Sequence, residues 1–134
     1  MSKKVLGIVA EYNPFHNGHK YHIDEAKKLV NPDITVCAMS GNFVQRGEPA
    51  IFNKFTRAKT AINNGIDIVV EIPTYFAVST AENFAYSSVA LLKNMGVTHI
   101  AKGKINTTET SRNWHCCNCT FFRQFLHTIT VTTS

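Results

Sequence analysis

Apolar runs alternate with amphipathic segments along the first hundred residues of this chain. Four short runs, at residues 5–10, 34–39, 66–72 and 97–101, are mainly apolar. Such runs are typical of strands whose two faces are both covered. In the segments between them, apolar residues recur every three or four positions, which predicts helices. The faces consist of Ile23, Ala26 and Val30 in the first helix, Phe55, Ala58 and Ile62 in the second, and Phe84, Ala85, Ser88, Leu91, Leu92 and Met95 in the third.

The ends of these helices carry recognisable stop and start signals. Proline at position 32 ends the first helix, which begins near Lys20, because the residue before a proline disfavours helical backbone. Asn53 is a candidate N-cap for the second helix. Residues 79–82 read Ser-Thr-Ala-Glu and match a capping box for the third helix, which ends at Gly96. Residues 40–51 show no periodicity and are interpreted as a loop.

The order strand, helix, strand, helix, strand, helix, strand predicts the fold class. It favours an α/β, Rossmann-like parallel sheet with helices on both faces and right-handed crossovers. Ligands in such sheets bind beyond the carboxyl ends of the strands. We therefore expect the turn after the first strand, the loop 40–51 and Gly103 to gather at one edge.

The turn after the first strand holds the densest set of candidate functional residues. It reads Asn13-Pro-Phe-His-Asn-Gly-His19 and leads from a strand into a helix. Backbone N–H groups and the positive end of the helix dipole favour an anion at such a place. Gly18 would let a phosphate approach the backbone. His16 in the turn and His19 in the first helical turn add two side-chain donors.

Two strings in this region resemble a known family. His16-Asn-Gly-His19 resembles the H-x-G-H signature of the nucleotidylyltransferase superfamily. The string from Glu11 to His19, together with Met39-Ser-Gly-Asn-Phe-Val-Gln-Arg-Gly-Glu-Pro-Ala-Ile-Phe52, resembles the bacterial tRNA(Met) cytidine acetate ligase family. The similarity runs from about residue 4 to residue 103 and implies the fold called HUP or nucleotidylyltransferase-type.

The resemblance also implies a reaction. The enzymes activate acetate with ATP to acetyl-adenylate and transfer the acetyl group to the wobble cytidine of elongator tRNA(Met), giving N4-acetylcytidine. The implied partners are ATP, acetate and that tRNA, with Mg²⁺ as a further candidate and with neither DNA nor a membrane. His16 and His19 would be the catalytic donors. The implied ATP-binding residues are Val9, Ala10, Glu11, Tyr12, Asn13, Pro14, Phe15, His16, Asn17, Gly18, His19, Lys20, Tyr21, His22 and Gly103.

Four polar residues beyond the turn are candidates for substrate contacts. They are Asn42, Arg46, Lys54 and Arg57. Arg46 could meet a phosphate or carboxylate in fork geometry, and Lys54 and Arg57 share a helix face. An ordinary basic surface is the alternative interpretation. The acidic residues Glu11, Asp67 and Glu71 lack metal-ligand spacing, so no metal site is predicted, and a hydrogen-bonded structural role is favoured for Glu71.

Composition adds limits to this picture. The 134 residues have room for one domain, and the net charge of +5 suits a polyanionic partner. No apolar run is long enough to span a bilayer, and the N-terminus lacks the pattern of a signal peptide. We therefore expect a cytoplasmic protein. Cys37, alone in an apolar run, is expected to be a buried, inert thiol.

The chain changes character after Lys102. Residues 105–134 contain no Ala, Gly, Pro, Asp or Lys but eight Thr and three of the four Cys. Gly103 stands in Ala-Lys-Gly-Lys, where the family usually has Phe-Gly-Ser-Glu. We expect a nucleotide-binding domain at 1–103, incomplete relative to the family, and a divergent, frame-shifted tail at 104–134 that is not a domain. The single C-x-x-C in that tail is a weak zinc signal.

Two other functions remain open from the residues themselves. One is a different H-x-G-H enzyme, a nucleotidylyltransferase that forms a nucleotide cofactor from a phosphate ester. The other is a non-catalytic nucleotide- or RNA-binding module. Pyrophosphate exchange with acetate or with a phosphate ester discriminates the two enzymes, and ATP binding without exchange would indicate the module.

Overall fold

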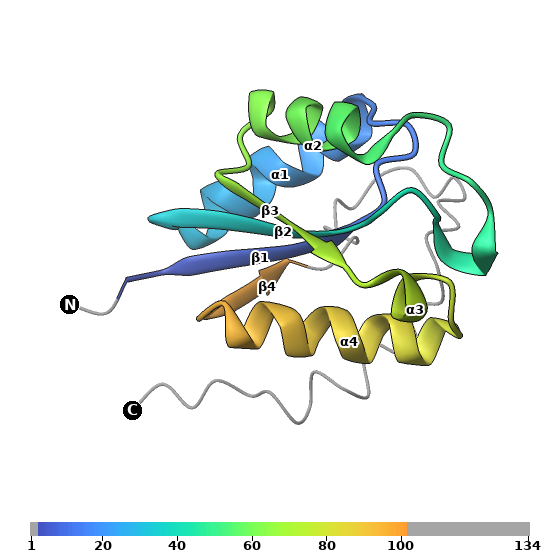
Figure 1. Ribbon diagram of the computed structural model, residues 1–134. Helices are drawn as coiled ribbons and strands as arrows, with labels where there is room; N and C mark the ends of the chain where they lie inside the picture. Colours follow the sequence, from blue (N-terminus) through green and yellow to red (C-terminus); the bar gives the residue numbers. More distant parts are fainter. Residues whose placement is uncertain (1–2, 102–134) are drawn as a thin grey trace, which may run out of the picture.

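The computed structural model describes residues 3–101, in which strands and helices alternate (Figure 1). Gly103, the C-x-x-C and the domain boundary expected at residue 103 lie outside these residues. The elements are β1 (Val5–Ala10), α1 (Asn17–Val30), β2 (Ile34–Ser40), the 3-10 turn η1 (Gln45–Gly47), α2 (Lys54–Asn63), β3 (Ile68–Ile72), α3 (Thr74–Ala77), α4 (Ala81–Asn94) and β4 (His99–Ala101).

The strands form one parallel sheet in the order β3-β2-β1-β4. Helices α1 and α2 cover one face, and α3 and α4 cover the other (Figure 1). The predicted fold class is therefore confirmed. The chain winds outward from β1 to β3 and then crosses back to place β4 on the other side of β1. The strand order thus reverses between β1 and β4, and such sheets bind ligands outside that point.

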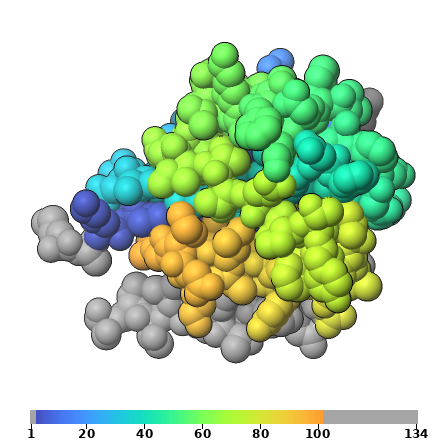
Figure 2. All heavy atoms as spheres, viewed as in Figure 1, coloured from blue at the N-terminus to red at the C-terminus, as the bar shows by residue number. Residues whose placement is uncertain are grey.

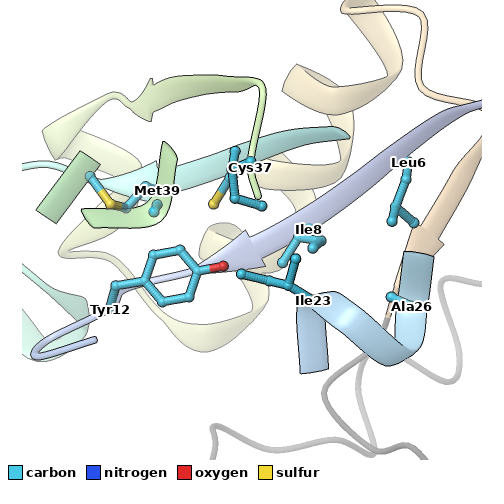
Figure 3. Packing of buried hydrophobic residues seen from close by; sticks show 9 residues of the cluster. Leu6, Ile8, Tyr12, Ile23, Ala26, Cys37 and Met39 are labelled. Atoms are coloured by element: carbon cyan, nitrogen blue, oxygen red, sulfur yellow. The ribbon is translucent and has the colours of Figure 1, made fainter. Parts of the chain in front are cut away.

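Two apolar layers follow from the alternation of side chains along the strands. Leu6 and Ile8 of β1 pack with Ile23 of α1 on one face of the sheet (Figure 3). On the other face, a second cluster contains Val36 of β2 and the fully buried Leu92 of α4. Each layer fixes the strand ends from which the loops depart.

Helix α4 approaches β1 closely because a glycine lies between them. A Cβ built on Gly7 would lie 2.7 Å from Val97 Cγ1 and 3.0 Å from Leu92 Cδ1. Real Cβ atoms do not pack at 2.7 Å, so a side chain here would force the two apolar neighbours to move. Gly7 therefore sets the distance between α4 and the central strand.

The structure corrects several boundaries. Helix α1 begins at Asn17 rather than near Lys20, with His16 as its N-cap, and β3 begins at Ile68. The N-cap of α4 is Thr80, whose hydroxyl accepts a hydrogen bond from the Asn83 N–H, so the capping box at 79–82 was placed one residue early. The short elements η1 and α3 were not predicted from the sequence.

The face predicted for the second helix is correct for Ala58, which packs against the core, but wrong for Phe55 and Ile62. Phe55 is 76% exposed and Ile62 is 49% exposed, whereas Arg57 and Ala61 are buried. The face of α2 that packs on the sheet therefore differs from the face that the apolar residues predict. The reason is that a charged side chain, Arg57, occupies the buried position in the first turn of the helix. Met95, expected on the apolar face of α4, is also exposed.

The loops that follow the strands gather at the carboxyl edge of the sheet. Helix α3, which follows β3, lies against η1 of the loop after β2. Figure 2 shows these two segments side by side, in yellow-green and in cyan to teal, at the edge toward which the arrowhead of β3 points in Figure 1. This edge is where the fold predicts a ligand.

Candidate functional site

An aromatic anchor holds the turn that leaves β1. Tyr12 adopts a left-handed backbone (φ 48°), and its side chain is only 2% exposed. Figure 3 shows its ring reaching in among Met39, Cys37 and Ile8. Its ring also meets Phe15 and His19 edge-on, at centroid distances of 4.8 and 4.9 Å. The buried Tyr12 ring therefore fixes the turn to the hydrophobic core.

The two groups buried at this anchor stay protonated. Burial raises the pKa of the Tyr12 hydroxyl well above its usual range and raises the pKa of the Cys37 thiol to about 12. Cys37 is fully buried, as the sequence predicted. Neither group supplies a charge to the turn, so both have a packing role.

The two histidines form a reciprocal cap at the start of α1. His16 Nδ1 accepts a hydrogen bond from the Gly18 N–H at 3.1 Å, and the His16 N–H donates to His19 Nδ1 at 3.2 Å. The imidazole rings stack with centroids 3.7 Å apart and planes 24° from parallel. The arrangement is a capping box in which histidines replace the usual Ser/Thr and Glu/Gln.

This cap decides the tautomer of both rings. A nitrogen that accepts a hydrogen bond carries no proton, so in each neutral ring the proton must lie on Nε2. Burial, and then the neighbouring His16 and His22, lower the pKa of His19 to about 4. His19 is therefore neutral at pH 7, and the one N–H of its ring is on Nε2.

The N-terminus of α1 adds a positive potential beside these donors. The helix has 14 residues and no acidic residue in its first turn, so the positive end of its dipole is not neutralised there. Lys20 pairs with Asp24, one turn further along, at 3.2 Å. The ammonium group is thus directed along the helix rather than toward its N-terminus.

The implied ATP-binding residues that the structure describes lie in one continuous stretch. Val9 and Ala10 end β1, residues 11–16 form the turn and its cap, and residues 17–22 form the first turns of α1. Gly103 is not among the described residues. The structure therefore brings the stretch to the carboxyl end of β1, next to the place where the strand order reverses.

Side-chain hydrogen bonds join this turn to the loop after β2. Glu11 Oε1 accepts from the Gln45 N–H at 2.7 Å, and Asn13 Oδ1 accepts from the Ile51 N–H at 2.7 Å. Arg46 lies in η1 on that loop with φ 75° and is exposed. The loop 41–52 is thus tied to the turn after β1, as expected from the topology.

Arg57, another of the substrate candidates, is a buried side chain. Its side chain is 2% exposed and donates to three backbone carbonyls, those of Glu11, Gly41 and Phe52. Burial lowers the pKa of the guanidinium, and the nearby Glu11 and Glu71 carboxylates oppose that shift. Each nitrogen of Arg57 thus has a backbone partner, and the substrate role expected of Arg57 stays a prediction.

Two further substrate candidates are Lys54, the first residue of α2, and Asn42, in the loop after β2. Lys54 Nζ pairs with Glu71 Oε2 at 2.7 Å, and Asn42 Oδ1 accepts from the Lys54 N–H at 3.2 Å. Lys54 and Glu71 border a hollow of about 200 Å³ whose lining also includes Met39 and Phe55. This volume is below the roughly 300 Å³ of small ligand pockets. Glu71 is engaged in an ion pair, in agreement with its predicted structural role.

Within residues 3–101, no group of three or more His, Cys, Asp or Glu side chains could hold a metal ion. The helices of that part of the chain are also too short or too polar to span a bilayer.

Sequence reasoning missed three features of the site. They are the reciprocal histidine cap, the buried Tyr12 ring, and the hydrogen bonds by which the Glu11 and Asn13 side chains hold the loop after β2. The cap had a local signal, since H-x-x-H occupies the positions of S-x-x-E in a capping box. The hydrogen bonds of Glu11 and Asn13 connect residues that are 34 and 38 positions apart in the sequence, and no local pattern reveals such contacts.

Comparison with known proteins gives consistent matches. A family model described as HIGH Nucleotidyl Transferase matches residues 3–113. The tRNA(Met) cytidine acetate ligase of Thermosipho africanus is 63% identical over 101 residues, which is 75% of this chain and 24% of that protein. The protein of the same name from Leuconostoc mesenteroides is 54% identical over 75% of this chain and 26% of its own length. This chain spans about a quarter of such curated relatives.

Two solved structures are also similar to this chain. Thermotoga maritima TmcAL bound with alpha-thio ATP has a TM-score of 0.68 and 55% identity, covering 70% of this chain and 23% of that one. A lipopolysaccharide core biosynthesis protein from Thermoplasma volcanium has a TM-score of 0.52 at 13% identity and covers 74% of this chain and 73% of that one. The second similarity concerns the fold alone.

Proposed function

The chain belongs to the HIGH nucleotidyl transferase family, and from that premise we propose that it carries the ATP-binding part of a tRNA(Met) cytidine acetate ligase. Two comparisons support the assignment. Curated relatives of that name are up to 63% identical to this chain over the matched region. The matched structure of Thermotoga maritima TmcAL is bound with alpha-thio ATP.

The observation that carries the proposal is the reciprocal hydrogen-bonded cap of His16 and His19. Each Nδ1 accepts a backbone N–H, so each ring has its proton on Nε2. Two neutral N–H donors at the N-terminus of α1 suit the phosphates of ATP, because donors and helix dipole both favour negative charge. Neutral rings can donate there without requiring an added proton.

The first proposed step forms acetyl-adenylate. A carboxylate oxygen of acetate attacks the α-phosphorus of ATP, the bond to the bridging oxygen breaks, and pyrophosphate leaves with that electron pair. Negative charge on the phosphoryl oxygens and on the leaving group is stabilised by the two Nε2–H donors and by the helix N-terminus. Preorganisation by the reciprocal cap means that the donors need not reorganise during the step.

The second proposed step transfers the acetyl group to tRNA. The exocyclic amine of the wobble cytidine attacks the acetyl carbon, the bond to AMP breaks, and the nitrogen loses a proton to give N4-acetylcytidine. This step needs a tRNA surface that residues 3–101 do not define. Among residues 3–101, no group of three or more His, Cys, Asp or Glu side chains could hold Mg²⁺.

An exchange assay tests the proposal. Radioactive pyrophosphate should enter ATP when the chain is given ATP and acetate, and the exchange should be lost without acetate. Incorporation that depends on a phosphate ester instead would indicate a cofactor-forming nucleotidylyltransferase. ATP binding with no exchange would indicate a nucleotide-binding module and would refute the catalytic part of the proposal for this chain. For substitutions of His16 or His19 in this assay, substitution of His99 is the matched control. His99 pairs with Leu6 near the opposite end of the sheet.

A further inference from the structure

Arg57 is the largest of the fully buried side chains in the described part of the chain. Arginine is almost never fully buried without partners, since a buried charge is costly unless it is hydrogen-bonded. Arg57 makes no ion pair within 4 Å among residues 3–101. Its partners are instead backbone carbonyls.

These carbonyls come from three separate segments. Arg57 Nη1 donates to Glu11 in the turn after β1, Nη2 donates to Gly41 just after β2, and Nε donates to Phe52 at 3.0 Å, just before α2. Two further hydrogen bonds, from Gln45 to Glu11 and from Ile51 to Asn13, run between the same turn and loop. One guanidinium therefore lies where the turn after β1 (residues 11–16, called the nucleotide turn) meets the loop 41–52.

The geometry of this junction requires an arginine. A guanidinium holds its N–H donors in a rigid planar fork, so it can serve three fixed carbonyls at once. A lysine ammonium is a single point charge and cannot span the same three oxygens. Arg57→Lys would keep the charge but leave buried carbonyls without donors, which is unfavourable.

We propose that Arg57 is a positioning residue of the ATP site, which couples the nucleotide turn to the loop 41–52. The inference rests on the proposed function, because it takes residues 11–22 as the ATP-binding stretch. The guanidinium holds the carbonyl of Glu11, five residues before His16, in a fixed relation to the loop. Nucleotide binding at the turn therefore tightens the loop, and loosening the loop weakens nucleotide binding by the same factor.

The test compares Arg57→Lys with Lys59→Ala, an exposed basic residue on the same helix. ATP affinity is measured by equilibrium dialysis, and amide hydrogen exchange is measured at Gln45 and Ile51 with and without ATP. In the unsubstituted chain and in Lys59→Ala, ATP should slow exchange at both amides. In Arg57→Lys, ATP affinity should fall roughly tenfold, within the usual range of coupling between sites, and the ATP-dependent slowing should disappear.

Chemical rescue separates positioning from stability. Arg57→Ala with added methylguanidinium should regain ATP affinity, whereas methylammonium should not restore it. Unchanged ATP affinity and unchanged ATP-dependent protection in Arg57→Lys, even with a lower melting temperature, would overturn the inference. If Arg57→Lys fails to fold, the unsubstituted chain decides: ATP binding without a change at Gln45 and Ile51 overturns the inference alone. No ATP binding at all overturns the proposed function together with the inference.

Discussion

His16 performs two separable tasks, and one substitution can remove the second while it keeps the first. Its Nδ1 caps α1 by accepting from the Gly18 N–H at 3.1 Å, while its Nε2 is the proposed donor to phosphate. In His16→Asn the side-chain oxygen is bonded to Cγ as Nδ1 is in histidine, and Asn is among the best N-caps. The cap should therefore survive while the Nε2 donor is lost. His16→Ala removes both.

The magnitudes of the two effects differ enough to be told apart. Loss of the cap in His16→Ala should cost about 1 kcal/mol of stability, or roughly 4–8 °C in melting temperature for a domain of this size. His16→Asn should melt close to the unsubstituted chain. Loss of one preorganised donor should cost about 3–4 kcal/mol of transition-state stabilisation, a fall of roughly a hundredfold to a thousandfold in rate.

The assay is acetate-dependent pyrophosphate exchange, with thermal melting on the same samples and His99→Asn as the control. Both His16 variants should lose exchange, and only His16→Ala should lose stability. Exchange in His16→Asn within a few-fold of the unsubstituted chain would refute the donor role. Equal losses of stability in both variants would refute the capping argument.

Three further predictions follow from other contacts. Gly7→Ala should destabilise the fold by about 1–3 kcal/mol, as overpacking does, because the new Cβ meets Val97 and Leu92; urea unfolding that shows no loss would contradict the packing. Because the pKa of His19 is about 4 when folded and about 6.5 when unfolded, only the unfolded state takes up this proton between those values. Stability should therefore fall as the pH drops from 6.5 toward 4, and His19→Asn should flatten that slope in pH-dependent melting. Native Cys37, whose pKa burial raises to about 12, should resist iodoacetamide at pH 8 and react after unfolding, as peptide mapping would show.

The sheet was predictable because each strand is coded locally. The apolar runs at 5–10 and 34–39 match β1 and β2 almost to the residue. The order β3-β2-β1-β4 was not predicted, since it depends on where the chain crosses back over the sheet. That order is what places the histidine turn beside the reversal point.

The second helix was misread for a physical reason. Apolar spacing selected Phe55 and Ile62, but the buried position in the first turn of α2 belongs to Arg57. A charged residue becomes a core residue here because carbonyls 46 and 16 positions away satisfy it. Such distant partners leave no trace in the local pattern of apolar and polar residues, so the surface interpretation was the natural one.

The central claim is that His16 and His19 present Nε2–H donors to the phosphates of ATP. The most direct test is nitrogen NMR of the chain labelled at its histidine rings and titrated with ATP, with His16→Asn and His19→Asn assigning the signals. Before ATP, both rings should show a proton on Nε2 and none on Nδ1, and ATP should then shift their Nε2 signals while leaving His99 unchanged. Protonated Nδ1 atoms, or ATP binding that leaves both Nε2 signals in place, would contradict the claim.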